Sequence, residues 1–180
     1  MPPKPLTKLL GAILAGGQAR RFGIDKAQAL YEGARLIDRV ASALAAQCSG
    51  VVVCGREEPG FACIPDWPET GLGPLGGLAA ALRHAETGGF SHVLSAGVDV
   101  PDLPHDLAPS LAGEGAAIVE SQPVVGLWPV SEFPALEAFL GGGGRSLYRC
   151  ADALGARRVD LAAPLMNVNY PKDLSPPRCD

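Results

Sequence analysis

The sequence predicts one α/β domain, a Rossmann-like three-layer α/β/α arrangement around a mostly parallel sheet. A length of 180 residues and an apolar fraction of 47% suit a single domain with a substantial core. Short apolar runs alternate along the chain with segments whose apolar residues recur at helical spacing, as expected for a parallel sheet covered by helices on both faces. We expect the domain to cover residues 1–174 and the proline-rich residues 175–180 to form a disordered tail.

The first half of the chain is expected to contribute three strands and two helices. The strands are the apolar runs at residues 9–14, 51–53 and 92–96. One helix lies between the first two strands, and the other begins at Pro74 and leads into the third strand. The apolar stripes of these helices consist of Ile37, Val40, Ala41, Leu44 and Cys48, and of Leu75, Leu78, Ala79 and Leu82.

The second half of the chain is expected to hold two further strands, two helices and a final pair of extended runs. Glycines 141–144 separate the two helices and end the first of them, because glycine is the usual residue just past a helix end. The strands are placed at residues 116–119 and 124–128, the helices at 131–140 and 146–154, and the extended runs at 157–161 and 165–168.

Charge and hydropathy argue against two classes of partner. Acidic residues outnumber basic ones by 19 to 15, so the net charge is −4 and no general attraction to nucleic acid or to an anionic membrane is expected. No apolar run reaches the ~18 residues of a spanning helix. The apolar run 9–15 has the outline of a signal peptide, but it is short and Arg20 and Arg21 follow at once, so we interpret it as a strand.

The cysteines predict thiols rather than a disulfide framework. They form no C-x-x-C pair, and their odd number leaves one unmatched in any pairing scheme. We therefore expect free, mostly buried thiols and a cytoplasmic protein, because the cytoplasm keeps thiols reduced. The cysteines are Cys48, Cys54, Cys63, Cys150 and Cys179.

The strongest chemical signal is the glycine-rich segment 14–26, which directly follows the first strand. In an open α/β sheet the ligand crevice lies beyond the carboxyl ends of the strands, so this segment would border it. Gly16 and Gly17 let backbone amides approach phosphates, and Arg21 and Lys26 supply positive charge. The segment is not a Walker A loop, because G-x-x-x-x-G-K-[ST] is absent. A glycine-rich turn with two solvated basic residues is the alternative interpretation.

A second glycine cluster at residues 71–76 matches the dinucleotide pattern G-x-G-x-x-G by accident. It does not follow the first strand, and Pro74 within it is better explained as the first residue of a helix. We expect Gly76 and Gly77 to leave one face of this helix start open to the close approach of a flat ligand.

Asp99 is the predicted metal ligand. It follows the apolar strand 92–96, so its carboxylate would enter the same crevice as the glycine-rich segment. A carboxylate beside nucleotide phosphates usually acts through magnesium, and Mg²⁺ is therefore the expected cofactor. Asp102 lies between two prolines and is interpreted as a turn residue. The three histidines show no metal-ligand spacing.

Six motifs occur along nearly the whole chain in an order that is typical of one family. They are L-A-G-G-x-x-x-R-x-G-x-D-K at 14–26, Asp66 followed by Gly73-Pro-Leu-Gly-Gly77, Asp99-x-Pro-x-Leu-Pro104, residues 123–128, Gly144-Arg-Ser-Leu147, and Asn167-Val-Asn169-x-Pro171-x-Asp173-Leu174. In this order they resemble the molybdenum cofactor guanylyltransferase family. The first motif alone is shared by many nucleotidyltransferases, whereas the joint order is specific.

The resemblance implies a nucleotidyltransferase that transfers GMP from GTP to the terminal phosphate of molybdopterin-bound molybdenum cofactor and releases pyrophosphate. GTP, the cofactor and molybdoenzyme or chaperone recipients are the implied partners, with no nucleic acid or membrane. Lys26, Arg21 and Asp99 would be catalytic, with Mg²⁺ on Asp99. The implied nucleotide-binding residues are Leu14, Ala15, Gly16, Gly17, Arg21, Lys26, Asp66, Gly76, Gly77 and Asp99, with Asp66 on the guanine edge, and Asn167 or Asn169 would complete the metal or phosphate site.

Two other functions stay open at this point. One is a different nucleotidyl transfer, such as cytidylylation of the same cofactor or charging of a sugar phosphate. The other is an inactive nucleotide-binding protein of the same fold. The chain also departs from the resembled pattern at Tyr170, where Thr is usual, and it leaves little room for a final helix after Pro171. Asp66, between Pro65 and Trp67, would merely cap a turn in the alternative interpretation.

Overall fold

The computed structural model describes residues 8–16 and 25–174. Gly17 and Arg21 of the glycine-rich segment lie outside the described residues, as does the tail expected at 175–180.

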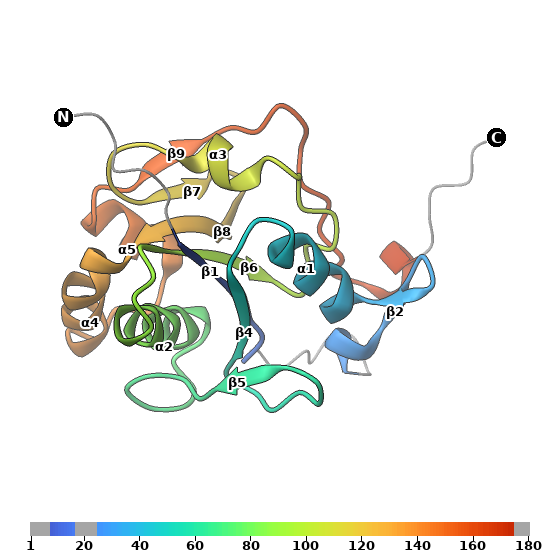
Figure 1. Cartoon of the computed structure of the whole chain (residues 1–180), viewed down its shortest axis with the longest axis horizontal. Coiled ribbons are helices and arrows are strands. Elements are labelled where there is room, and N and C mark those ends of the chain that lie inside the picture. The colour runs from blue at the N-terminus through green and yellow to red at the C-terminus, as the bar shows by residue number, and fades with distance from the viewer. Residues whose placement is uncertain (1–7, 17–24, 175–180) are drawn as a thin grey trace.

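One seven-stranded sheet forms the centre of the domain, in the order β5-β4-β1-β6-β8-β7-β9 (Figure 1). Every neighbouring pair is parallel except the two made by β8, which runs antiparallel to β6 and to β7. The predicted mostly parallel sheet is thus confirmed. The strands are β1 (Leu9–Leu14), β4 (Gly50–Cys54), β5 (Ala62–Ile64), β6 (His92–Gly97), β7 (Ala117–Val119), β8 (Gln122–Pro129) and β9 (Arg157–Val159).

Helices cover both faces of this sheet, which confirms the three layers. The core on one face contains apolar residues of α1 and α3, and the core on the other contains those of α2, α4 and α5. Figure 1 shows the two groups on opposite sides of the strands. The helices are α1 (Leu36–Ala45), α2 (Pro74–Thr87), α3 (Leu107–Leu111), α4 (Phe133–Gly141) and α5 (Leu147–Ala153).

The apolar run near the start of the described chain forms the central strand β1. All six of its residues are buried, as expected for a parallel strand packed on both faces. Leu10 contributes to the core beneath α2, and Ile13 contributes to the core beneath α1. Gly11 lies under α1, where an added Cβ would come 3.1 Å from Leu44 Cβ. The missing side chain therefore lets the helix pack close to the strand.

The expected extended run at 165–168 is not a strand. Val168 is buried, and its N–H donates to the carbonyl oxygen of Asp99 at 2.8 Å, so the segment is bound to the loop after β6 and joins no sheet. The reason is that an apolar run can be buried by packing against a loop as well as by joining a sheet. The expected run 157–161 is shorter than predicted, because β9 ends at Val159.

Several short elements were not expected from periodicity. β2 (Leu30–Tyr31) and β3 (Ala34–Arg35) form a separate two-stranded hairpin whose turn has φ +48° at Glu32 and +82° at Gly33, a turn geometry suited to tight hairpins. β5 and α3 are also too short to show a period. Three 3-10 turns complete the described chain: η1 (Lys26–Gln28), η2 (Val130–Glu132) and η3 (Pro171–Leu174).

Candidate active site at the carboxyl ends of β1, β4 and β6

Three parallel strands end side by side and define the site. Leu14 at the end of β1 pairs with Cys54 of β4 on one side and with Gly97 of β6 on the other. The chain then continues as Ala15, whose N–H still donates to the Cys54 carbonyl oxygen at 3.0 Å, and as Gly16. The segments that follow β1, β4 and β6 therefore emerge at one edge of the sheet, where ligands bind in folds of this type.

Asp66 lies in a cradle of four glycines at this edge. A Cβ added to Gly55 would come 2.7 Å from Asp66 Oδ1, and one added to Gly16 would come 3.3 Å from Oδ2. A Cβ on Gly76 would come 3.2 Å from Asp66 Cβ, and one on Gly77 would come 3.6 Å from Oδ1. The structure thus brings together the ends of β1 and β4, the start of α2 and a single carboxylate.

The Asp66 carboxylate is poorly satisfied where it lies. Its Oδ1 is buried and accepts no hydrogen bond from any residue that the structure describes. Burial raises the pKa of this carboxyl above its ordinary value, because desolvation penalises the charged form. The backbone beside it is held instead by the Trp67 N–H, which donates to the Gly76 carbonyl oxygen at 3.1 Å. Among the described residues no hydrogen bond of Asp66 caps a turn, and its buried Oδ1 is left without a partner, which a bound ligand with a hydrogen-bond donor could supply.

Gly76 and Gly77 do not leave the helix start open on the side where a side chain would project. A Cβ on Gly76 would lie 2.9 Å from Leu72 Cβ, and one on Gly77 would lie 3.2 Å from Cys54 Cβ. Both glycines are buried, so the protein itself occupies that space. The expectation of an open face is wrong, because the missing side chains are needed for α2 to approach β4 and Asp66. Gly73, with φ +64°, precedes Pro74 as the cap of α2, which confirms Pro74 as its first residue.

Lys26 and Asp99 meet across the site. Lys26 Nζ lies 3.9 Å from Asp99 Oδ2, and both side chains are mostly covered, with 16% and 26% of their surfaces exposed. Lys26 is therefore not the solvated base of the alternative interpretation. Asp99 follows β6 closely enough that a Cβ on Gly97 would overlap its Oδ1. Glycine at that position leaves room for the carboxylate to turn back toward the strand end.

The C-terminal segment is bound to the loop that carries Asp99. The Val168 N–H binds the Asp99 backbone, and the neighbouring Asn167 has a buried Oδ1 without a hydrogen-bond donor among the described residues. Asn169 is exposed, and its N–H and that of Tyr170 each donate to Asp173 Oδ2 at 2.9 Å. These two bonds, followed by the charges of Lys172 and Lys26, lower the pKa of the Asp173 carboxyl. Asp173 thus caps η3, and the Tyr at position 170 does not need to.

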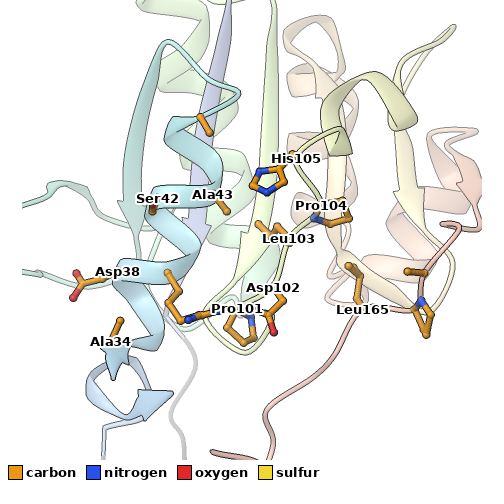
Figure 2. Close-up of a pocket in the computed structure, with 14 residues that line it drawn as sticks. Ala34, Asp38, Ser42, Ala43, Pro101, Asp102, Leu103, Pro104, His105 and Leu165 are labelled. Carbon is orange, nitrogen blue, oxygen red and sulfur yellow. Dashed lines mark hydrogen bonds and ion pairs between the residues drawn. The ribbon is translucent and has the colours of Figure 1, made fainter. Parts of the chain in front are cut away.

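Asp102 is part of a salt-bridged surface and not of the strand-end cluster. It accepts from Arg39 Nη2 at 2.6 Å and from the Tyr31 hydroxyl at 3.3 Å. The predicted turn residue therefore has a definite role, which is to tie the loop after β6 to α1. Asp102 lines a groove of about 740 Å³ between α1 and residues 101–105. Figure 2 shows Asp102 beside α1, with Leu165 farther from the helix.

Among the described residues, the cysteines and the possible metal ligands give little support to catalysis by a thiol nucleophile or by a cluster-bound metal. Burial raises the pKa of the Cys48 thiol to about 12 and that of Cys150 to about 11, so both are poor nucleophiles near neutral pH. The cysteines within the described ranges, 48, 54, 63 and 150, form no disulfide. In the same ranges no group of three or more His, Cys, Asp or Glu side chains is arranged to hold a metal ion, and no helix could span a membrane.

Sequence reasoning missed three charged residues, linked by salt bridges, that include the residue before Lys26. Asp25 precedes it, and Arg56 and Glu58 follow β4; Arg56 Nη2 lies 2.5 Å from Asp25 Oδ2 and 3.1 Å from Glu58 Oε2. The only sequence signal was the position of Asp25 beside Lys26 in the first motif. Contacts between residues 25 and 58 depend on the meeting of two loops, which no local pattern predicts.

Comparison with known proteins identifies the family of this chain. The family model described as the MobA-like NTP transferase domain matches residues 11–159, which include most of β1, the glycine cradle, Lys26 and Asp99. The chain belongs to the MobA-like NTP transferase family. It is thus a member of a nucleotidyltransferase family, as the sequence motifs indicated.

Curated relatives of this family match nearly end to end. The chain is 35% identical over 179 residues to the molybdenum cofactor guanylyltransferase of Rhodobacter capsulatus, with 93% of this chain and 94% of the relative covered. It is 37% identical over 184 residues to the protein of the same name from Cereibacter sphaeroides, with the same coverage.

Solved structures show the same fold. The molybdopterin-guanine dinucleotide biosynthesis protein A of Archaeoglobus fulgidus superposes with a TM-score of 0.72 at 22% identity, over 92% of this chain and 94% of the other. The 2-C-methyl-D-erythritol 4-phosphate cytidylyltransferase of Thermus thermophilus superposes with a TM-score of 0.68 at 18% identity and the same coverage. The MobA-like fold is therefore shared by enzymes named for different nucleotides, and the base must be decided by the site.

Proposed function

We propose that this MobA-like protein transfers GMP from GTP to the terminal phosphate of the molybdopterin-bound molybdenum cofactor. The relatives that match nearly end to end carry the name of this activity. The observation that carries the proposal is Asp66, a carboxylate whose buried Oδ1 has no donor among the described residues and which lies in a cradle of glycines. The proposed site of action is the cytoplasm, with a molybdoenzyme or its chaperone as recipient of the product.

Asp66 favours guanine over the other bases. Guanine presents a ring N–H and an exocyclic amine side by side, and one carboxylate can accept from both. Cytosine and adenine each present an amine next to a ring acceptor, which would place a lone pair against the carboxylate. A buried polar group left unmatched in this way discriminates strongly against the wrong ligand. Gly16 and Gly55 let the ends of β1 and β4 lie close to the carboxylate, because a Cβ at either position would crowd Asp66.

Lys26 is proposed to act on the triphosphate. Its ammonium lies 3.9 Å from Asp99 at the end of the glycine-rich segment, so it can exchange the carboxylate for phosphate oxygens without leaving the site. Arg21 is proposed to assist it from the same segment, together with backbone N–H groups of residues 14–17. Negative charge grows on the leaving pyrophosphate as the reaction proceeds, and a preplaced cation stabilises that charge.

The residues around Asp99 fit a magnesium ion. Mg²⁺ prefers oxygen ligands and is usually held by one or two carboxylates together with substrate phosphates. Asp99 supplies a partly exposed carboxylate, and Asn167, next to the residue that binds the Asp99 backbone, has a buried amide oxygen without a described donor. Asp99 and Asn167 would hold the ion, which when bound would neutralise phosphate charge. Asn169 is exposed and is a weaker candidate.

The reaction needs no covalent enzyme intermediate. An oxygen of the cofactor's terminal phosphate forms a bond to the α-phosphorus of GTP, and the bond from that phosphorus to the β-phosphate oxygen breaks. The electron pair of the broken bond leaves with pyrophosphate. The chain's own residues align the two phosphates and neutralise their charge, which is where most catalysis of phosphoryl transfer comes from.

A radiolabelled-nucleotide assay tests the proposal against its alternatives. Protein is incubated with GTP or CTP labelled at the α-phosphate, with and without molybdopterin cofactor. Label from GTP should move to the cofactor only when both are present. Transfer from CTP would favour the cytidylyl alternative, and binding without transfer would favour an inactive nucleotide-binding protein.

A further inference from the structure

Glu58 is the one acidic side chain that is buried among the residues described. Only 1% of its side chain is exposed, although it lies in the loop that follows β4. Neither base recognition nor phosphate binding uses it. A buried carboxylate is retained at a cost unless its partners satisfy it, so its contacts indicate what it is there to hold.

Its contacts come from three separate segments. Gln28 Nε2 lies 2.9 Å from both carboxylate oxygens, and Arg35 Nη1 donates to Oε1 at 2.9 Å. Arg56 Nη2 lies 3.1 Å from Oε2. Arg35 is further fixed by a two-pronged pair with Asp38 on α1, at 2.7 Å for each contact. Glu58 therefore joins η1, the start of α1 and the β4–β5 loop.

Arg56 extends this cluster to the residue before Lys26. Its two terminal nitrogens bind the two oxygens of Asp25, at 2.8 and 2.5 Å. The bond from Arg56 lowers the pKa of the Asp25 carboxyl, which stays ionised. Asp25 Oδ1 also accepts from the Ala27 N–H at 3.1 Å and so caps the turn in which Lys26 is the first residue.

The residues on either side of Lys26 and Ala27, which are Asp25 and Gln28, are thus both linked to Glu58. Asp25 is held through Arg56, and Gln28 is held by Glu58 directly. We propose that Glu58 is a positioning residue for Lys26: it fixes the backbone of η1 so that the lysine ammonium stays at the strand ends opposite Asp99. This inference rests on the proposed nucleotidyl transfer, because Lys26 has its role there.

Positioning predicts a specific kinetic signature. A lysine that drifts by about 1 Å should still attract the triphosphate but should stabilise the transition state poorly, since such misplacement can cost about a hundredfold in rate. Turnover should therefore fall while nucleotide affinity changes little. The effect should also vanish when Lys26 is absent, because the contributions of residues that act as a unit are not additive.

Two variants and one matched control test the role. Glu58→Gln keeps the shape of the side chain and removes its charge. Arg56→Lys keeps the charge and loses the two-pronged contact with Asp25. Arg158→Lys is the control, because Arg158 also bridges two carboxylates, Glu120 and Asp152, but at β9. Each is assayed for kcat with GTP and molybdopterin cofactor, for GTP affinity by calorimetry, and for melting temperature, in the wild-type and Lys26→Met backgrounds.

The expected result is a fall in kcat of roughly ten- to a hundredfold for Glu58→Gln and Arg56→Lys, with GTP affinity within about threefold of wild type. In the Lys26→Met background the same changes should lower kcat by less than about twofold. If Glu58→Gln does not fold, Arg56→Lys carries the test.

Three results would overturn the positioning role. They are full turnover in both variants, a loss of turnover that merely follows the loss of folded protein, and an equal further loss in the Lys26→Met background. An inactive wild type would instead overturn the proposed function, and the positioning role with it.

Discussion

Gly55 and Asp66 approach each other so closely that a Cβ on the glycine would lie 2.7 Å from the Asp66 Oδ1. Gly55 also has φ +84°, a backbone conformation that favours glycine. The end of β4 therefore needs glycine for two reasons, backbone conformation and space for the carboxylate. The need for space concerns the proposed ligand site, and substitutions can separate its effect from that of the backbone conformation.

Gly55→Ala should weaken GTP binding and lower stability beyond the backbone effect. The matched control is Gly60→Ala, since Gly60 has φ +87° and no atom within 4 Å of an added Cβ. The positive φ alone should cost each variant about 1–3 kcal/mol. In thermal unfolding, Gly55→Ala should melt lower than Gly60→Ala, and only Gly55→Ala should lose GTP affinity. Equal melting temperatures and equal affinities would show that the cradle tolerates a side chain.

Asp66→Asn should raise the melting temperature at neutral pH and abolish the preference for GTP. Burial raises the pKa of Asp66, so the folded state binds its proton more tightly than the unfolded state. The native protein is therefore destabilised as pH rises through the raised pKa, and the amide removes that effect. Each kcal/mol gained would raise the melting temperature by about 2–4 °C in a domain of this size.

The measurement for Asp66 is a pair of titrations. Melting temperatures of the wild type and Asp66→Asn should converge as pH falls below the raised pKa, and wild-type GTP affinity should fall over the same range because guanine donors need the ionised carboxylate. Glu69→Gln, an exposed neighbour, serves as control and should change neither. A variant that still prefers GTP over CTP would remove Asp66 from base recognition.

Asp99→Asn should abolish turnover and leave the protein folded. The carboxylate is partly exposed and its contact with Lys26 is 3.9 Å, so its loss should affect stability little. The loss of a metal ligand should lower kcat by about a hundredfold or more, equivalent to about 2.7 kcal/mol. Asp102→Asn is the control, because Asp102 binds Arg39 and lies outside the strand-end cluster. Magnesium-dependent kinetics of both variants decide the question, and normal turnover in Asp99→Asn would contradict the assignment.

Lys26→Met should lower kcat more than it raises the KM for GTP. Methionine keeps an unbranched apolar stem and removes the charge, which matters most when charge develops in the transition state. We expect a fall in kcat of roughly tenfold or more. Lys8→Met is the control, since Lys8 contacts the Gly88 carbonyl oxygen near the start of β1. Weakened binding with unchanged kcat would make Lys26 a ground-state anchor only.

The sequence by itself determined the layers and most of the long elements. Helical spacing and apolar runs are local properties, so β1, β6, α1 and α2 were predicted within a few residues of their observed bounds. The sequence also placed Lys26 and Asp99 after strands of the same sheet, because parallel strands present their carboxyl ends at one edge. Elements of two to five residues, such as β2, β5 and α3, have no period to detect.

Only the tertiary structure decided how the site is built. The burial of Asp66 depends on four glycines from three segments, and the environment of Glu58 depends on the meeting of residues 28, 35 and 56. The same holds for residues 165–168, which bind the loop after β6 instead of forming a strand. Desolvation and ion pairing are set by neighbours distant in the sequence, so a local pattern can name a charged residue without indicating what will surround it.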